Sequence, residues 1–260
     1  MIDYAFTYAS LEYFLLIFTR VTCFVFIAPF FSMNNTPRQI RVGISFFVSL
    51  LVFFVLAPSE PLQYDTWLGY TVIVMKEALT GFIIGFGANL CNSIVSFAGH
   101  VIDMETGLAM VTIMDPTTKE STSISGVFYQ YMITLMLIVS GMYQYLLKAL
   151  VDTFTLIPIN GAVFRTDSLT TSVVRFMSDY IIIGFRICLP IFLVMVMLNV
   201  ILGILAKVSP QLNMFAVGIQ IKILVGLSVL FLTAGMLPVA SNFIFEQMKK
   251  IVVSFVEGLM

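Results

Sequence analysis

Five ionisable residues lie within or at the edge of apolar stretches of this 260-residue chain, and their types could support chemistry. They are Arg20, Glu77, Asp103, Arg186 and Lys222. A charge at the centre of a membrane helix costs about 2.5–3.5 kcal/mol on insertion scales, so each should face a partner or water. Three cations and two acids predict buried ion pairs that fix helix register and support assembly. A proton or ion relay, or contact with a transported substrate, stays open as an alternative.

The other reactive residues form no catalytic or metal-binding pattern. His100 is the single histidine, which cannot build a multi-histidine metal site. Cys23, Cys91 and Cys188 are far apart and inside apolar runs, as expected of buried thiols. Nothing resembles the sequence around a nucleophilic serine. We therefore expect no catalytic activity, no cofactor and no metal.

Long uncharged runs indicate the helices that must position the five ionisable residues. No Asp, Glu, Lys or Arg occurs in residues 78–99, 121–147, 187–206 or 223–245. Uncharged runs of 18 or more residues are typical of membrane-spanning helices. The composition agrees, with 60% hydrophobic and 10% charged residues and a mean hydropathy of +1.04. The net charge of -1 argues against nucleic acid as a partner. The sequence predicts an all-α protein of the membrane or of a membrane-embedded complex.

Six apolar stretches and one looser segment organise the chain as a single all-helical unit. The looser segment covers residues 152–179. The last two apolar stretches flank a tight connection at 208–213, where Pro210 ends the preceding helix, so they are expected to form a helical hairpin. Gln211 and Asn213 offer hydrogen bonds that lipid cannot satisfy, which predicts an exposed turn. The six stretches are residues 11–31, 42–57, 67–102, 126–151, 180–207 and 215–245.

Gly81 and Gly85 have the small-xxx-small spacing that lets helices approach closely in an apolar environment. The spacing is common by chance and carries no chemistry. We therefore expect these two glycines to mark a helix-packing face.

The segment 104–122 follows the longest apolar stretch and does not continue as a regular helix pattern. Its Gly, Thr and Asp-Pro signals favour irregular backbone, yet its methionines and aliphatic residues are too apolar for a solvated loop. Irregular backbone at membrane depth must be buried in protein or line a water-filled cavity. The segment is either a loop packed against neighbouring helices or a re-entrant element that closes a channel. We call it the plug segment. Its predicted sealing residues are Met104, Gly107, Leu108, Met110, Ile113, Met114, Asp115 and Pro116.

The order and spacing of motifs along nearly the whole chain identify a known family. They are Arg20, Pro29, Pro37, Arg41, Glu77-x3-Gly81-x3-Gly85, Gly99-x3-Asp103-x3-Gly107, Asp115-Pro116, Pro158, Pro190 and Ser209-Pro-Gln-Leu-Asn213-Met-Phe215-x2-Gly218-x3-Lys222. With these motifs the chain resembles the FliR family of export-gate subunits in flagellar and injectisome type III secretion.

The resemblance implies a fold and a function. Residues 1–179 would form a FliP-like helical part that includes the plug segment, fused to a FliQ-like helical hairpin at 180–260. One such subunit closes a helical ring of FliP and FliQ copies. That ring is the entry portal for unfolded export substrates, and the plug segment would project into its channel and help to seal it.

The resemblance also implies partners and a location. FliP-like and FliQ-like subunits, membrane lipid and, at the 208–213 turn, FlhB are the expected partners. The expected location is the flagellar basal body in the bacterial inner membrane, with many helices held by other subunits above the bilayer plane. The family detail favours a flagellum over an injectisome. A small ion-coupled transporter and a scaffold for a membrane enzyme complex are the alternatives.

Overall fold

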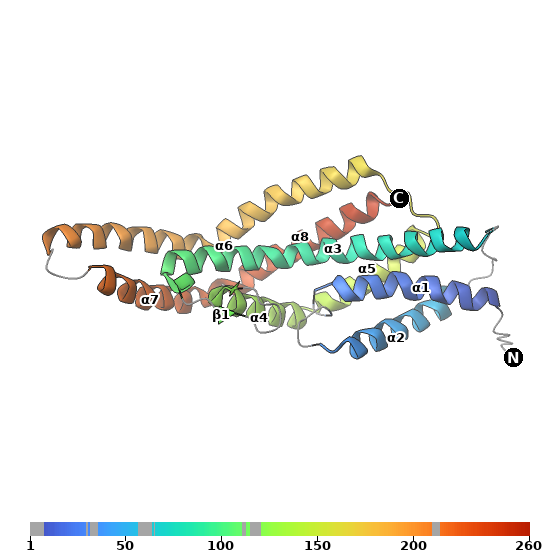
Figure 1. The fold of residues 1–260 in the computed structure, drawn as a ribbon, viewed down its shortest axis with the longest axis horizontal. Helices are drawn as coiled ribbons and strands as arrows, with labels where there is room; N and C mark the ends of the chain where they lie inside the picture. The colour runs from blue at the N-terminus through green and yellow to red at the C-terminus, as the bar shows by residue number, and fades with distance from the viewer. Residues whose placement is uncertain are drawn as a thin grey trace. The chain divides into compact units, whose positions relative to one another are not determined.

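The computed structural model describes residues 8–29, 31, 36–56, 64, 66–110, 113–114, 121–209 and 214–260 (Figure 1). Two short 3-10 helices, η1 (Leu108–Met110) and η2 (Ala234–Met236), and the paired strands β1 (Ile113–Met114) and β2 (Ser121–Thr122) interrupt a helical chain. The predicted all-α class is confirmed. The α-helices are α1 (Tyr8–Ile27), α2 (Arg38–Leu56), α3 (Trp67–Thr106), α4 (Ile124–Val139), α5 (Met142–Leu156), α6 (Thr166–Val208), α7 (Met214–Thr233) and α8 (Leu237–Glu257).

Among the described residues, five helical segments are long and apolar enough to cross a membrane, judged by length and composition, or six if α4 and α5 count as one broken span. They are α1, α2, α3, α6 and the run formed by α7 and α8. Only 17% of the most apolar window of α6 is buried within the chain, and α2 is equally open. Lipid or other protein must therefore cover much of these helices.

The stretch predicted at 126–151 is two helices and not one. α4 ends at Val139 and α5 begins at Met142. Between them Gly141 has a φ of +72°, a left-handed conformation that glycine adopts without steric cost. The prediction was wrong because the absence of charge was given more weight than the turn signal of Ser140 and Gly141.

The predicted start of the stretch 180–207 was also wrong. α6 begins at Thr166, inside the segment 152–179 that was expected to be loose. Asp167 in its first turn and Lys207 in its last turn have the signs that the helix dipole favours. Phe176 is buried while Asp167 is exposed. The charges in this segment therefore belong to the polar face of an amphipathic helix and do not indicate a loop.

The predicted stretch 215–245 is also divided. α7 ends at Thr233, η2 follows, and α8 continues to Glu257. Gly235 and Pro238 explain the interruption, because neither residue favours the interior of a helix. The charges after residue 245 did not end α8, since they alternate with the buried face that contains Met248 and Phe255.

The chain folds into two compact units, each assembled from separated parts of the sequence. The first unit contains Met1–Leu90, Gly141–Val174 and Met248–Met260. The second contains Cys91–Ser140 and Arg175–Gln247. The expected division into 1–179 and 180–260 concerns similarity to two other proteins and stays a prediction.

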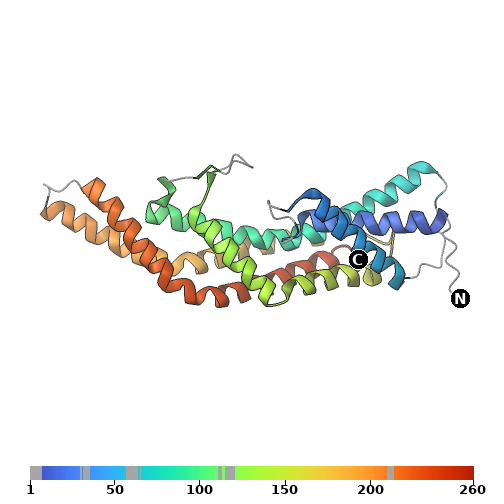
Figure 2. The same ribbon diagram turned by 90° about the horizontal axis from the view of Figure 1, so that it is seen from below.

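In the first unit, α1 and α2 lie side by side (Figure 2). The ring of Phe14 in α1 contacts the rings of Phe46 and Phe53 in α2, with centroid distances of 5.6 and 6.0 Å. Just after α8, the carbonyl oxygen of Leu259 accepts a hydrogen bond of 3.0 Å from the backbone N–H of Val163. Aromatic packing and a backbone bond thus connect separated parts of this unit.

In the second unit, the C-terminal part of α3 packs against α4 and α6. Gly99 of α3 lies against the backbone of Gly126 in α4. The ring of Phe97 lies against Gly184 of α6 and 5.7 Å from the ring of Phe185. These small-residue contacts bring the helix backbones close together.

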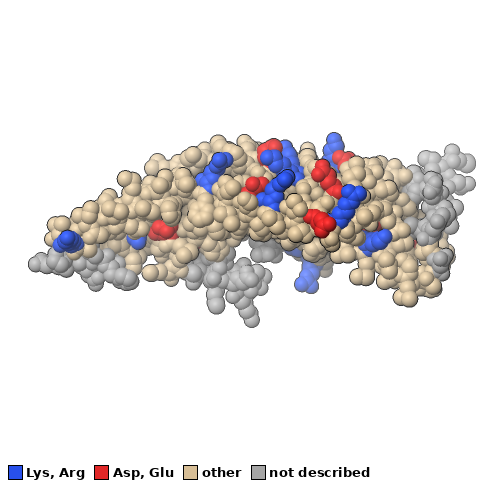
Figure 3. All heavy atoms as spheres, turned by 90° about the horizontal axis from the view of Figure 1, so that it is seen from above, with Lys and Arg blue, Asp and Glu red and all other residues tan. Residues whose placement is uncertain are grey.

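Charged side chains of both signs are intermixed on the face drawn in Figure 3. The chain has 13 basic and 14 acidic residues, so neither sign is in large excess. Among the described residues on this face there is no extended basic surface of the kind that nucleic-acid binding requires.

Candidate functional site

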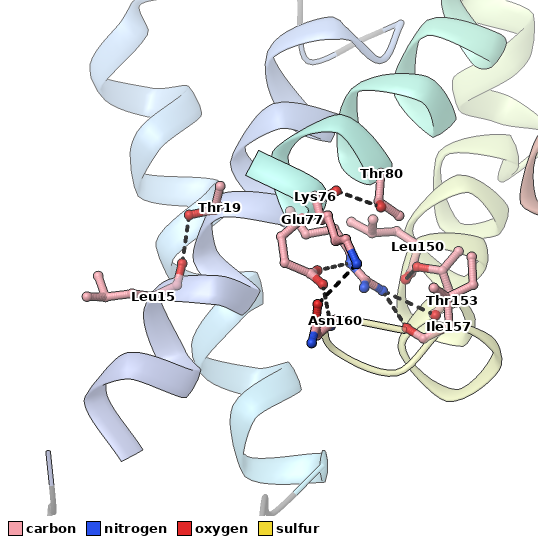
Figure 4. Close-up of polar contacts among 10 residues, drawn as sticks. Leu15, Thr19, Lys76, Glu77, Thr80, Leu150, Thr153, Ile157 and Asn160 are labelled. Carbon is pink, nitrogen blue, oxygen red and sulfur yellow. Dashed lines mark hydrogen bonds and ion pairs between the residues drawn. The ribbon is translucent and has the colours of Figure 1, made fainter. Parts of the chain in front are cut away.

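A buried ion pair joins α1 to α3 in the first unit (Figure 4). The Nε atom of Arg20 lies 2.6 Å from Oε2 of Glu77, and both side chains are 0% exposed. The pair brings together two of the five ionisable residues that the sequence singled out. An ion pair removed from water is stable only if hydrogen bonds satisfy its remaining polar atoms.

Arg20 finds further partners at the C-terminal end of α5, although its buried Nη2 atom has no hydrogen-bond partner among the described residues. Its Nη1 atom donates to the carbonyl oxygens of Thr153 at 3.2 Å and Ile157 at 3.0 Å. The guanidinium also lies 4.4 Å from the centre of the Phe154 ring. The last carbonyl groups of a helix lack helical partners and carry partial negative charge, so a cation is favoured here. Arg20 therefore connects α1, α3 and α5.

Glu77 uses its second oxygen to hold the loop after α5. The backbone N–H of Asn160 donates to Oε1 of Glu77 at 3.0 Å. Asn160 has a φ of +66°, a conformation that asparagine tolerates better than most residues. Its side-chain oxygen also accepts a hydrogen bond of 3.4 Å from Lys76. Both carboxylate oxygens of Glu77 are thus engaged, as in a structural ion pair.

Gly81 and Gly85 lie on the face of α3 that meets α1. A Cβ atom at Gly81 would overlap the carbonyl group of Arg20, and one at Gly85 would lie 3.0 Å from the carbonyl oxygen of Phe24. At Gly81 only glycine allows the observed approach of the two backbones, whereas a side chain at Gly85 would require a small shift of α1.

Asp103 is placed in the second unit, where it accepts from backbone and forms no ion pair with a cation among the described residues. Its Oδ1 and Oδ2 atoms lie 3.2 and 3.4 Å from the backbone nitrogen of Ser125. Ser125 is in the first turn of α4, and the side chain of Ser123 caps the same helix by accepting from Gly126. The start of a helix has free N–H groups and favours negative charge, so Asp103 is compensated there.

Among the described contacts, Arg186 and Lys222 form no ion pair with Glu77 or Asp103. The guanidinium of Arg186 lies 5.0 Å from the centre of the Phe243 ring, and its side chain is exposed. Lys222 is half-buried in α7. Within the described part of the chain no carboxylate forms an ion pair with either cation.

The plug segment begins later than predicted. α3 continues through Met104 to Thr106, and the irregular backbone starts at Gly107, which has a φ of +82°. Thr106 is buried, and its hydroxyl donates to the carbonyl of Ile102 one turn earlier. A threonine near a helix end can thus stay helical by bonding to the preceding turn, so its presence does not by itself indicate irregular backbone.

Beyond Gly107 the described backbone is irregular, as predicted. η1 is followed by β1, whose Ile113 pairs with Thr122 and whose Met114 pairs with Ser121 in antiparallel register. Leu108 is buried, whereas Met104 and Met110 are 73% and 69% exposed. Asp115 and Pro116 lie outside the described residues.

The turn predicted after α6 is bounded as expected, because α6 ends at Val208 and α7 begins at Met214. Pro210, Gln211 and Asn213 lie outside the described residues. The exposure predicted for them stays a prediction.

The structure adds residues that the sequence reasoning missed. Asn160 contacts Glu77, Ser125 contacts Asp103, and Ser123 caps the helix to which Asp103 binds. Ser123 carried a readable signal, because a serine just before an apolar run is a typical helix cap. The described residues contain no group of three or more His, Cys, Asp or Glu side chains that could hold a metal.

Comparison with known proteins matches residues 11–248 to the family described as bacterial export proteins, family 1. Curated relatives are named flagellar biosynthetic protein FliR. The protein of Bacillus subtilis is 28% identical over 235 residues, which cover 90% of each chain. That of Aquifex aeolicus is 26% identical over 245 residues, covering 94% of this chain and 93% of the relative. That of Escherichia coli is 25% identical over 231 residues, covering 86% and 84%.

Proposed function

Since this chain belongs to family 1 of the bacterial export proteins, we propose that it is a subunit of the flagellar type III protein export gate. The observation that carries the proposal is the family match over residues 11–248. In this function the chain forms part of the entry portal through which unfolded export substrates cross the bacterial inner membrane, and it needs no catalytic residue.

FliP-like and FliQ-like subunits are the proposed neighbours in the gate, with FlhB at the 208–213 turn. The open apolar surface supports this assignment, because the most apolar windows of α2 and α6 are each only 17% buried. Arg186 supports it too, since an exposed guanidinium on so apolar a helix needs an acceptor that lipid tails do not offer.

We propose that the plug segment helps to seal the channel at rest. A seal must exclude ions yet yield to a passing polypeptide, which many weak contacts of flexible side chains achieve better than a rigid core. The left-handed Gly107 and the exposed Met104 and Met110 support this assignment.

The ion pair of Arg20 and Glu77 has a structural part in this proposal. Within the described part of the chain, the Glu77 carboxylate contacts Arg20 through one oxygen and the backbone of Asn160 through the other. We therefore assign the pair to holding α1, α3 and α5 together for assembly, in preference to a proton relay.

The test is deletion of the gene in its own bacterium, combined with purification of a tagged copy from the membrane. We expect the deletion strain to lack flagellar filaments and to stop exporting flagellar proteins. The tagged chain should restore export and copurify with FliP-like and FliQ-like subunits from the inner membrane. Normal filaments in the deletion strain, or a functional tagged chain isolated without those subunits, would contradict the proposal.

A further inference from the structure

We propose that the outer face of α2 lies against the acyl chains of the inner membrane, while Arg38 at the start of α2 lies among the headgroups of the cytoplasmic leaflet. The inference deepens the proposed function and rests on it, because it assumes that the gate is assembled in that membrane. All of the residues that carry it belong to the first unit. The outer face consists of Phe47, Leu51, Phe54 and Val55.

The polarity of α2 is reversed relative to a helix of a water-soluble protein, whose apolar side faces the core. The buried face of α2 contains Ser45, Ser49 and Val52, which are at most 3% exposed. The four side chains of the outer face are larger and apolar, and they are between 51% and 76% exposed. The outer face therefore needs an apolar environment that the chain itself does not supply.

The buried serines indicate which apolar environment this is. The hydroxyl of Ser45 donates to the carbonyl of Arg41 at 2.8 Å, and that of Ser49 donates to the carbonyl of Ser45 at 2.6 Å. Both hydroxyls are thus satisfied within α2. Where helices pack in apolar surroundings, small residues mark the contact between helices. The outer face has only large side chains, which favours lipid over a second helical subunit.

The length of α2 matches the bilayer. Its 19 residues extend over about 28 Å, close to the thickness of about 30 Å of a hydrocarbon core. Residues 42–56 contain no Asp, Glu, Lys or Arg. α2 can therefore cross the core once without placing a charge in it.

The contacts between α1 and α2 show which ends of the two helices lie together. The ring of Phe14, near the start of α1, lies 6.0 Å from the ring of Phe53, near the end of α2. The guanidinium of Arg41, in the first turn of α2, lies 5.9 Å from the centre of the Phe26 ring, near the end of α1. The two helices are therefore antiparallel, and their pair has two chemically different ends.

One end of the pair is aromatic. The hydroxyl of Tyr64 donates to Oε1 of Glu12 at 2.7 Å, and that of Tyr70 donates to the backbone carbonyl of Glu12 at 3.3 Å. These bonds join the start of α3 to the start of α1 (Figures 1 and 2). Trp67 and Tyr8, the first residues of α3 and α1, are 92% and 86% exposed. Tryptophan and tyrosine are enriched where a membrane meets water, so this end fits one interface.

The other end of the pair is basic. Arg38 is the first residue of α2 and is exposed. A cation here opposes the helix dipole, so the stability of α2 does not explain it. Residues 28–41 contain two arginines and no acidic residue, whereas 1–12 and 57–66 each contain two acidic residues and no basic one. Lipid phosphates attract arginine, and basic connections stay on the cytoplasmic side. Arg38 therefore marks the cytoplasmic interface, and Trp67 marks the opposite one.

The first experiment measures what covers the outer face in the assembled complex, placed in vesicles of phosphatidylethanolamine and phosphatidylglycerol. Nitroxide labels are attached to Phe47→Cys, Leu51→Cys and Phe54→Cys, with the parent chain, whose Cys23 is half-buried, as background. Collisions of the labels with oxygen, which concentrates in lipid, and with a water-soluble nickel chelate are measured. The matched control is Val52→Cys on the buried face of the same helix.

We expect several-fold more oxygen collisions at positions 47, 51 and 54 than at 52, with few nickel collisions at all four. Low collision rates with both agents on the outer face would show that another subunit covers it and would overturn the proposal. Frequent nickel collisions would show water there and overturn it equally. If Val52→Cys does not assemble, the ratio of oxygen to nickel collisions at position 47 decides: a high ratio supports the proposal and a low one overturns it.

The second experiment tests the orientation with a thiol reagent that cannot cross the inner membrane. Trp67→Cys should react in intact cells, whereas Gln39→Cys, exposed beside Arg38, should react only after the inner membrane is permeabilised. The opposite pattern would overturn the orientation.

The two proposals can fail separately. A functional chain that is isolated without FliP-like and FliQ-like subunits contradicts the proposed function, whatever covers α2. An assembled complex that exports flagellar proteins but has low collision rates at positions 47, 51 and 54 retains the proposed function and contradicts only the lipid contact.

Discussion

Gly81 of α3 lies so close to the backbone carbonyl of Arg20 in α1 that a side chain at this position would overlap it. One turn earlier on the same face, Glu77 forms the ion pair with Arg20. The close approach of the helices and the 2.6 Å distance between the charged atoms therefore depend on each other. A methyl group at 81 would separate the helices at the point where the ion pair needs them together.

We expect Gly81→Ala to destabilise the assembled protein by about 1–3 kcal/mol, as for other overpacked positions. Gly43→Ala is the matched control, because no atom lies within 4 Å of a Cβ built there. It should be neutral or stabilising by up to about 1 kcal/mol, since alanine favours helix. Thermal unfolding of the detergent-solubilised complex measures both. Equal midpoints for the two variants would contradict the packing argument.

Removal of both partners of the buried ion pair should cost less than the sum of the two single removals. Arg20→Met leaves Glu77 buried without a cation, and Glu77→Gln leaves Arg20 without an anion, each at about 3–5 kcal/mol. The double variant should lose less than the sum of the two. Yield and unfolding midpoint of the copurified complex measure the three variants.

Lys76→Gln is the control for this series, because Lys76 is adjacent to Glu77 but its contact with Asn160 is exposed. Exposed polar pairs contribute little, so its effect should stay below about 1 kcal/mol. Strictly additive losses for Arg20→Met and Glu77→Gln would show that the two residues act separately.

The apolar runs predicted the helical class and most helix positions, because uncharged runs long enough to span a bilayer are a strong signal for helices. Sequence reasoning was wrong where local and long-range signals competed. Gly141 separates two helices inside an uncharged run, and α6 begins inside a polar segment, with Asp167 in its first turn. In the first case the backbone preference of one glycine, and in the second the position of one charge, had more effect than the average composition around it.

The need of buried charges for partners pointed to Arg20, Glu77 and Asp103, but not to what those partners would be. Glu77 binds a cation 57 residues away in sequence, and Asp103 binds the backbone of Ser125. Every residue except proline has a backbone N–H group, so the sequence does not show which of them binds a buried carboxylate. The C-terminal carbonyls of α5 that accept from Arg20 are hidden from sequence reasoning for the same reason.

The turn between α6 and α7 should contact another subunit of the gate. A photocrosslinking amino acid in place of Gln211 is expected to give a protein adduct, with FlhB as the proposed partner, because polar side chains at this turn are unsuited to lipid. Position 201, exposed on the apolar surface of α6, provides a comparison within the same hairpin. Adducts of position 211 with lipid probes alone would reject the assignment.

Shortening the plug segment should open the channel without dissociating the complex. The deletion should be limited to residues 108–113. Thr106 is buried against Gly226, and the backbone changes direction at Gly107, so both residues should be kept. Removal of these residues eliminates the exposed Met110 and the buried Leu108 but leaves the contact of Asp103 with Ser125. Since a seal depends on the summed contacts of many side chains, we expect several-fold higher ion conductance at rest.

The loss of the seal is measured as the membrane conductance of cells that express the shortened chain. A pull-down of the partner subunits from the same cells shows that the complex has assembled. A length-matched replacement of residues 108–113 by Gly and Ser is the control for loop length, and it should leak as well because it lacks the apolar side chains. An assembled complex that remains as tight as the parent in both variants would leave the segment as a packed loop without a sealing function.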